Sequence, residues 1–469
     1  MKNKLLLTGF LLTAGSFSIY ADDPCVSSQA PGYCSSRIVD SSVNEARETT
    51  DRAMALPNRL SENDFNAINN PSHLMNHGTA YLEGWTAQQY AWGGATIPLP
   101  IDNMKLGVFI RRPVSDRHPI FNTFINPALI GTAAAVSDDT ARIKYNTNAV
   151  PYMTQLGMLN TGAPARGLGN VDAFLGMSLG QSLNIGLRVG YMSASKKDTD
   201  NTATGTTFQR NESAIQEPSV GLGVQIKNLG PGYLDVAGSF SLPSAKWDAA
   251  TATNTYSAKN KFAYMANVLV RYVTPIGQNK LIVAAVADFY NIPMEMTDSN
   301  AAGSQKRIST ANYTSFSIDA AFWQTITDTK LKVIYSTGFG YLTQGYALKT
   351  DAVSGTGGPD TLTTSVDSQY RATHAYIPLG VAIEHQTLET LKTRFGVRKN
   401  VFAPKTTETT AGGTVTKESS SQFAVDEELM VALGLGWTPA AKVNIDLAMN
   451  ANAFKLDSFF TAISARYHY

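Results

Sequence analysis

The chain has 469 residues, of which 16% are charged, and its formal net charge is +1. This charge balance excludes a strongly basic nucleic-acid-binding protein, because no cationic surplus exists to neutralise phosphates. Beyond the N-terminus no apolar run reaches the roughly 18 residues that a transmembrane helix needs. The 37 glycines, together with 20 tyrosines and 20 phenylalanines, indicate a β-rich chain rather than a disordered one.

The N-terminus has the features of a secretory signal peptide, predicted to cover 1–21. Lys2 and Lys4 form a positive region, and 5–14 form an apolar stretch ahead of a small-residue cleavage site. The mature chain is therefore expected to begin at Asp22 and to leave the cytoplasm.

Cys25 and Cys34, the two cysteines, follow this site closely. In an oxidising compartment we expect them to form a disulfide that closes a small loop. Metal binding by two isolated cysteines is one alternative. Lipidation of Cys25 is another, although the preceding Ala-Asp-Asp-Pro lacks a lipidation box.

The segment 22–78 does not have the pattern of a strand. A capping box at Ser42 to Glu45 predicts a short helix that continues to about Ala55 and ends at Pro57. A polar, turn-rich stretch then runs up to the first strand. Ahead of a β-barrel, such a segment either stays in the periplasm or folds into the lumen as a hatch or plug.

From about residue 79 onward, apolar and polar residues alternate. Every odd position from Leu183 to Tyr191 is apolar, with Asn, Gly and Arg between, and the same alternation recurs in 429–437 and 443–450. Strict alternation predicts strands with one apolar and one polar face. A soluble β-sandwich would alternate as well, so the strands alone do not choose between the two folds.

The connections between strands decide the fold class. Tight turns alternate with long connections rich in Thr, Ser, Asn, Asp and Gly, and this asymmetry is typical of outer-membrane barrels. The long connections are 115–170, 194–218, 244–262, 292–312, 346–373 and 403–426. We therefore predict an all-β fold, a transmembrane antiparallel outer-membrane β-barrel of 14 to 16 strands over 79–469, with these connections as extracellular loops. Seven tight turns with both termini in the periplasm indicate sixteen strands, and merging of early segments would leave fourteen.

The last strand supports an outer-membrane location. Its apolar residues alternate and the sequence ends on an aromatic residue, with Tyr467 and Tyr469 on one face. This pattern is typical of the assembly signal of bacterial outer-membrane barrels. The expected partners are therefore the barrel assembly machinery and outer-membrane lipid, and the alternative is a buried edge strand of a soluble protein.

The sequence contains no recognisable catalytic or metal-binding pattern. The six histidines are scattered, and His73 and His77 have the spacing of metal ligands without a glutamate between them. No enzyme activity, cofactor or metal is expected, and no nucleic-acid partner.

The inward positions of the predicted barrel combine apolar residues with arginines. If the odd apolar residues face lipid, the lumen receives Phe109 together with Arg111, Arg188, Arg271 and Arg398. These residues are candidate ligand contacts for an amphipathic molecule with an anionic end. The alternative is that the charges form ion pairs that brace the wall.

The connection 115–170 contains an apolar run that a solvated loop should not expose. Phe121, Phe124 and Leu129 lie in it. An apolar patch in an external loop usually packs on something. The run is expected to fold over the barrel mouth as a lid or to form an outer capture site for a hydrophobic ligand, and these two roles can overlap.

The segment before the first strand resembles a known family. Asn70-Pro71-Ser72-His73-Leu74 is similar to the Asn-Pro-Ala-x-Leu element in the hatch of long-chain fatty-acid transporter-like (FadL-like) outer-membrane barrels, with Ser72 in place of the usual Ala. The opening strands, within about 60–115, are also similar.

This resemblance implies a fourteen-stranded barrel with an N-terminal hatch, in which Asn70, Pro71 and Ser72 form the hatch motif. It also implies inward transport of hydrophobic or amphipathic small molecules, such as fatty acids or aromatic hydrocarbons. A related branch of such barrels serves type IX secretion, so membership does not fix transport as the function. The alternatives are a surface-exposed structural or interaction barrel, a secretion-associated barrel without transport, and a general diffusion porin.

Overall fold

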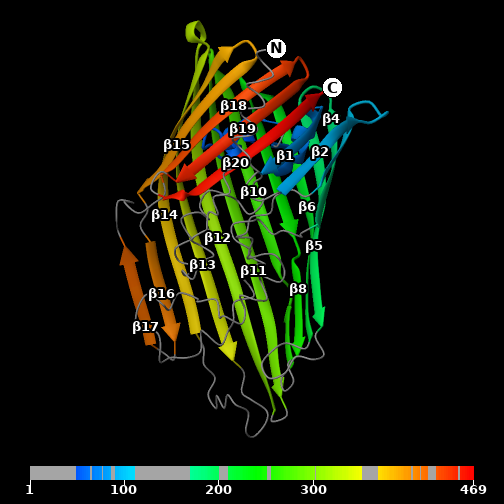
Figure 1. Ribbon diagram of the computed structural model, residues 1–469, viewed down its shortest axis with the longest axis vertical. Coiled ribbons are helices and arrows are strands. Elements are labelled where there is room, and N and C mark those ends of the chain that lie inside the picture. The colour runs from blue at the N-terminus through cyan, green and yellow to red at the C-terminus, as the bar shows by residue number, and fades with distance from the viewer. Residues whose placement is uncertain are drawn as a thin grey trace.

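The alternating segments of the sequence form strands, and the strands close into one antiparallel β-barrel in the computed structural model (Figure 1). The structure describes residues 49–63, 66–76, 78–85, 90–110, 169–199, 210–250, 255–300, 303–350, 368–402, 405–411, 414–420, 429–452 and 455–469. Among these residues, no helix is long and apolar enough to cross a bilayer.

Sixteen strands make up the ring, each paired with its neighbour in the order of the chain. They are β1 (Thr79–Trp85), β2 (Tyr90–Pro98), β3 (Met104–Ile110), β4 (Gly169–Leu179), β5 (Leu183–Thr199), β6 (Arg210–Leu229), β7 (Gly232–Ser241), β10 (Tyr264–Ile276), β11 (Asn279–Asn300), β12 (Gly303–Ile326), β13 (Leu331–Thr350), β14 (Ser368–Leu388), β15 (Leu391–Phe402), β18 (Met430–Ala440), β19 (Val443–Asn452) and β20 (Lys455–His468). Pairing of β1 with β20, from Thr79 opposite His468 to Trp85 opposite Ala462, closes the ring. The expectation of a barrel is confirmed, and its strand number is sixteen rather than the fourteen that the resemblance implies.

Where the structure describes the predicted long loops, much of the chain is strand, which corrects their description as loops at these residues. In place of the loop at 244–262, β8 (Ser244–Ala250) and β9 (Thr255–Asn260) form a hairpin that pairs with the outer parts of β6 and β11. In place of the loop at 403–426, β16 (Lys405–Ala411) pairs with β14, and β17 (Thr414–Ser420) pairs with β16.

The other three loop ranges are shortened by the long ring strands, which continue into 194–218, 292–312 and 346–373. The register between β11 and β12 runs unbroken to Asn300 opposite Gly303. Most residues of these extensions are polar, and only β11 keeps a short apolar alternation at Ile292, Met294 and Met296, so the hydrophobic pattern that predicts strands is weak there. Residues 115–168 lie outside the described residues.

The two faces of the wall have opposite character, as the alternation predicts. On β5, Arg188 is buried in the interior, while the neighbouring Val189 is 54% exposed on the outside. Leu222 on β6 is 60% exposed on the same outer surface. The outward apolar series of β5 runs from Leu183 to Tyr191, about the 9 to 11 residues of a transmembrane strand. This apolar outer surface, closed into a ring without an edge, is the structure of a large outer-membrane barrel.

The chain ends at the rim where the connections are tight, which we call the short-turn rim. Tyr467 and Tyr469 are 46% and 48% exposed there, and the Tyr469 amide donates to the Gly78 carbonyl oxygen at 3.2 Å. Interfacial aromatic residues of this kind are typical of membrane barrels. Their role as an assembly signal stays a prediction.

Replacing Leu222 by arginine should destabilise the barrel in a bilayer by about 2 to 4 kcal/mol, because a charge would enter the hydrocarbon near its midplane. The measurement is the urea midpoint of unfolding in phospholipid vesicles, followed by heat-modifiable gel migration. Thr255→Arg on the exposed outer hairpin is the matched control and should leave the midpoint unchanged. Equal losses in the two variants would remove the assignment of the lipid-facing side.

Candidate functional site

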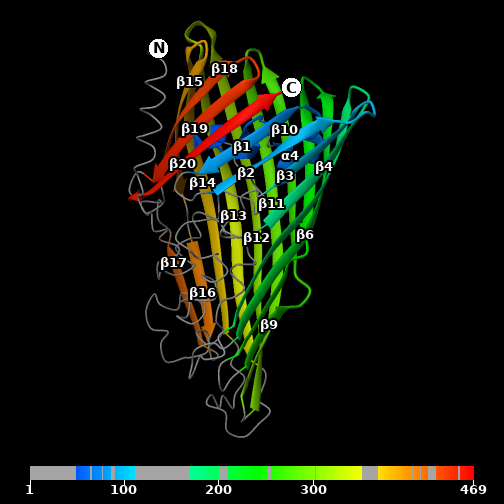
Figure 2. The same ribbon diagram turned by 45° about the vertical axis from the view of Figure 1, so that its right-hand side comes forward.

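Short helices before the first strand lie inside the barrel near the short-turn rim (Figure 2). They are α3 (Thr49–Arg52), η1 (Asn58–Leu60), α4 (Asn66–Asn69) and η2 (Pro71–Asn76). We call the described residues of 49–76 the plug segment. Its helix α3 contacts β18, β19 and β20, η1 contacts β11 and β12, and η2 contacts β3 to β6. The plug segment therefore reaches opposite sides of the lumen.

The hatch motif rests on two inward-facing glycines of the wall. A Cβ atom at Gly186 on β5 would overlap the backbone of Pro71, and one at Gly223 on β6 would lie 2.8 Å from Pro71 Cδ. Side chains at these two positions would therefore push the motif away from the wall. The glycines that alternate with leucine in this part of the sequence thus form a seat for the plug segment.

Asn70 and Ser72 hold the motif in its turn. The Ser72 amide and hydroxyl both donate to Asn70 Oδ1, at 3.1 Å and 2.7 Å, which closes an Asx-type turn. Asn70 Nδ2 in turn donates to the Val224 carbonyl oxygen at 3.4 Å. The serine in place of the family's alanine therefore adds a buried hydrogen bond within the motif.

A second glycine seat lies on the opposite wall. A Cβ atom at Gly396 on β15 would overlap the Met54 backbone, and one at Gly434 on β18 would overlap the Ala53 side chain. At both seats the plug segment packs directly on glycine backbone of the wall, where larger side chains would hold it off the wall.

Buried polar contacts fix the plug segment between the seats. Arg59 forms an ion pair with Asp319 of β12 at 2.8 Å. Arg188 Nη1 donates to the Ile68 carbonyl oxygen at 3.1 Å, and Trp323 Nε1 donates to that of Leu60 at 3.1 Å. Barrel side chains thereby satisfy backbone carbonyls that the short helices leave without intrahelical partners.

Arg271 makes the most extensive of these buried polar contacts. Its Nε and Nη2 lie 2.9 Å and 2.8 Å from Asp235 Oδ2, and its Nη1 donates to the Ser61 carbonyl oxygen at 2.8 Å. His73 Nε2 lies 2.9 Å from Asp235 Oδ1 and 3.1 Å from Arg271 Nη2. Arg271 and Asp235 face each other across the β7–β10 register, so neighbouring strands bring the pair together.

The sequence-predicted ligand residues have different places. Phe109, Arg188, Arg271 and Arg398 are buried on the lumen side. Phe109 packs in a cluster with Leu74 of the plug segment, and Arg188 and Arg271 bond to that segment. These contacts give three of the residues a role in holding the plug segment, while ligand binding by any of them stays a prediction. Arg111, Phe121, Phe124, Leu129, Cys25 and Cys34 lie outside the described residues.

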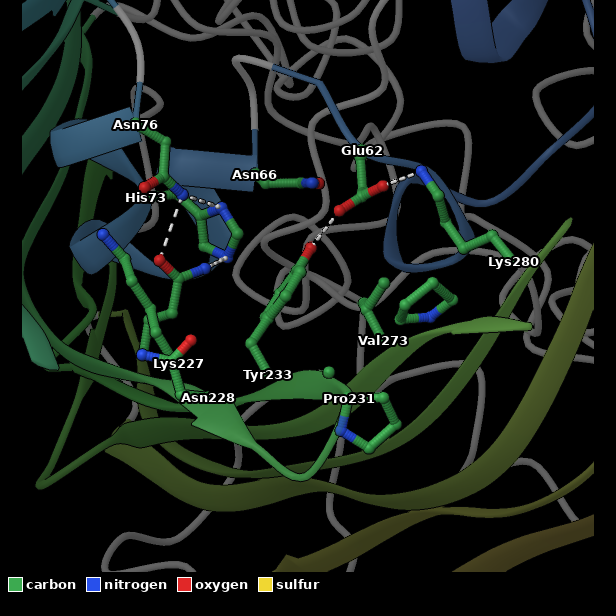
Figure 3. Close-up of a pocket in the computed structure, with 13 residues that line it drawn as sticks. Glu62, Asn66, His73, Asn76, Lys227, Asn228, Pro231, Tyr233, Val273 and Lys280 are labelled. Atoms are coloured by element: carbon green, nitrogen blue, oxygen red, sulfur yellow. Dashed lines mark hydrogen bonds and ion pairs between the residues drawn. The ribbon is translucent and has the colours of Figure 1, made fainter. Parts of the chain in front are cut away.

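A cavity of about 540 Å³ opens between the plug segment and the wall near the short-turn rim (Figure 3). Most of the residues that line it are polar or charged; the lining residues are Glu62, Asn66, His73, Asn76, Gln225, Lys227, Asn228, Pro231, Gly232, Tyr233, Val273, Pro275 and Lys280. Among the described residues, no group of three His, Cys, Asp or Glu side chains is arranged to hold a metal ion.

Glu62 crosses this cavity from the plug segment to the wall (Figure 3). Its carboxylate accepts a hydrogen bond from the Tyr233 hydroxyl and forms an ion pair with Lys280. Burial raises the pKa of Glu62, but the charge of Lys280 and these hydrogen bonds outweigh it and hold the pKa below its usual value. Sequence analysis missed Glu62, Tyr233 and Lys280, because they lie far apart in the chain and no motif connects them.

On the side of the lumen away from the short-turn rim, the wall is aromatic. Tyr290 and Tyr313 stack with ring centroids 5.0 Å apart, and Tyr376 covers Gly340. Asp288 lies on β11, the strand of Tyr290, and accepts a hydrogen bond at 2.6 Å from Asn267 on the neighbouring strand β10. The lumen beyond the plug segment therefore combines apolar ring faces with a few fixed polar groups, as ligand sites commonly do.

No protein-family model and no curated protein matches this chain. Among solved structures, it is similar to the toluene transporter TodX of P. putida, at 8% identity and a TM-score of 0.38. It is also similar to the toluene transporter TbuX of Ralstonia pickettii, at 9% identity and a TM-score of 0.39, and each of these matches covers 91% of this chain and 99% of the other. A third is the ferric yersiniabactin uptake receptor FyuA of Yersinia pestis, with 9% identity, 84% and 80% coverage and a TM-score of 0.38. At these identities and scores the likenesses carry no argument about function, and membership of the FadL-like family stays a prediction.

Proposed function

We propose that this chain is an outer-membrane transporter through which hydrophobic or amphipathic small molecules, such as fatty acids or aromatic hydrocarbons, enter the cell. The observation that carries the proposal is the plug segment, which occupies the lumen at the short-turn rim and contacts opposite walls. A general diffusion porin requires an open aqueous channel, and this lumen is obstructed.

The contacts of the plug segment suit a part that moves. Its described contacts with the wall are glycine seats, hydrogen bonds, ion pairs and hydrophobic packing, and all of these can break and re-form. The wall beyond it carries the stacked rings of Tyr290 and Tyr313, which are buried in this structure and would become apolar surface for a ligand once their neighbours shift. In this proposal the solute collects on that wall and passes when the plug segment shifts.

A reversible cross-link tests whether transport depends on this movement. Leu74 of the plug segment and Gly176 of β4 suit paired cysteines, because a Cβ atom at position 176 would lie 3.2 Å from Leu74 Cβ. This is slightly below the roughly 3.5 to 4.5 Å of a disulfide, so a small shift suffices. With Cys25 and Cys34 changed to serine, cells carrying Leu74→Cys/Gly176→Cys should take up labelled decanoate at least about tenfold more slowly when oxidised, and reductant should restore the rate.

The two single-cysteine variants control for damage to packing and should not respond to reductant. Cells that carry only the empty vector set the background. The transport proposal would be rejected if cells with the reduced double variant and cells with the unmodified chain took up decanoate no faster than the empty-vector cells. Equal uptake in the oxidised and reduced states, with the cross-link verified by mass spectrometry, would reject movement of the plug segment.

A second candidate is a surface interaction protein. The hairpins β8–β9 and β16–β17 extend the wall beyond the apolar belt with polar residues, which a transport channel does not need. Deleting 244–260 separates the two functions. Loss of cell-surface binding with unchanged decanoate uptake would assign the hairpin to interaction.

A further inference from the structure

The ion pair between Glu62 and Lys280 differs from the other contacts that hold the plug segment. The Glu62 and Lys280 side chains are 31% and 39% exposed, whereas those of Arg59 and Asp319 are 4% and 1% exposed. Water and small solutes can therefore reach the Glu62 contact through the cavity. An exposed ion pair contributes little to stability, so replacing it with another ion pair costs little.

The wall side of this contact forms a receptor for a carboxylate. Lys280 supplies the charge and the Tyr233 hydroxyl supplies a second donor, both aimed at the Glu62 carboxylate. The Trp323 ring lies 5.8 Å from Lys280 Nζ and stabilises the ammonium group through a cation–π contact. The chain's own carboxylate thus shows which chemical group the site accepts.

The cavity around the receptor has room for more than Glu62. Its volume of about 540 Å³ lies within the roughly 300 to 1,000 Å³ of small-molecule sites. Lys227 adds a second cation to the lining, and Pro231, Val273 and Pro275 add apolar surface. This lining suits a small amphipathic molecule that has one anionic end.

We propose that the cavity binds the carboxylate of an amphipathic organic acid, which replaces the Glu62 carboxylate on Lys280 and Tyr233 and so loosens the plug segment. The inference rests on the proposed transport function and names a substrate class and a release step for it. Because the site lies near the short-turn rim, the acid binds on its way out of the lumen. Occupation of the site then weakens one of the contacts that closes the lumen.

A matched pair of aryl bromides tests the site. para-Bromobenzoate and para-bromobenzamide have nearly the same shape and differ in charge, and bromine quenches tryptophan fluorescence at short range. We expect para-bromobenzoate to quench Trp323 in the purified full-length barrel with at least fivefold tighter binding than para-bromobenzamide. Trp323→Phe should remove the saturable quenching and thereby assign the signal.

Two variants identify the contact. Lys280→Gln should abolish the preference for the carboxylate, and Glu62→Gln should tighten binding of para-bromobenzoate about fivefold, because it removes the competing charge. Lys332→Gln is the matched control, since Lys332 pairs with Glu384 at 3.5 Å and does not line the cavity. Heat-modifiable migration checks that each variant folds, and Lys280→Arg should keep the preference if Lys280→Gln does not fold.

Hydrogen exchange measures whether the plug segment is loosened. para-Bromobenzoate, but not para-bromobenzamide, should accelerate amide hydrogen exchange in 58–63 about fivefold. Equal binding of the two probes by both the parent and Glu62→Gln would overturn the site, and unchanged exchange at saturation would overturn the release step. If decanoate uptake fails while the preference for para-bromobenzoate persists, the transport proposal fails and the site stands. Uptake without that preference would reject the site alone.

Discussion

Replacing Gly186 by alanine should lift the hatch motif from its seat and open the lumen at the short-turn rim. The new Cβ atom would overlap the backbone of Pro71, which cannot move aside as a flexible side chain can. Overpacking of this kind costs about 1 to 3 kcal/mol. Since about 1.4 kcal/mol changes an equilibrium constant tenfold, the ratio of displaced to seated plug segment should rise about 5- to 150-fold.

Single-channel conductance in planar bilayers measures this change, and the variant should show long open events that the parent lacks. The control is Gly221→Ala, which adds the same methyl group on the lumen side of the neighbouring strand, β6. A Cβ atom there would lie 3.5 Å from the nearest atom of Arg188, an ordinary contact. Open events at equal frequency in both variants would contradict the seat, as would a closed Gly186→Ala barrel.

The alternation of residues predicted the strands and the side that faces lipid, and the alternation of tight turns with long connections predicted the barrel. Val189 and Arg188 fall on opposite faces because successive side chains of a strand point to opposite sides. The outer hairpins were missed for the opposite reason. In β16, Lys405–Ala411, neither face is apolar, so no hydrophobic period distinguishes a strand from a polar loop.

The candidate site was only partly accessible from the sequence. Inward positions for Arg188 and Arg271 follow from the strand period, but their bonds to Ile68 and Ser61 depend on how the plug segment folds back into the barrel. The period likewise places Gly223 on the lumen side, yet what packs against it appears only in three dimensions. Contacts between residues distant in the chain leave no local pattern, and the cavity at Glu62 is built from such contacts.

Arg271→Met should destabilise the barrel by about 3 to 5 kcal/mol, the cost of leaving one partner of a buried ion pair without its counter-charge. Arg271 is 2% exposed and Asp235 is fully buried, so water cannot replace the lost contacts. The Ser61 carbonyl oxygen also loses its donor, which weakens the hold on the plug segment. His73 and the Gln225 amide remain beside Asp235, and only a protonated His73 would supply a compensating charge.

The measurement is again the urea midpoint of unfolding in phospholipid vesicles. The double variant Arg271→Met/Asp235→Asn should recover at least half of the loss, because no unpaired carboxylate is left in the interior. Lys246→Met, which breaks the exposed ion pair with Asp248, should leave the midpoint unchanged, since solvent already screens that pair. If the double variant were as unstable as Arg271→Met, the loss would come from packing of the long arginine side chain and the ion pair would not be its source.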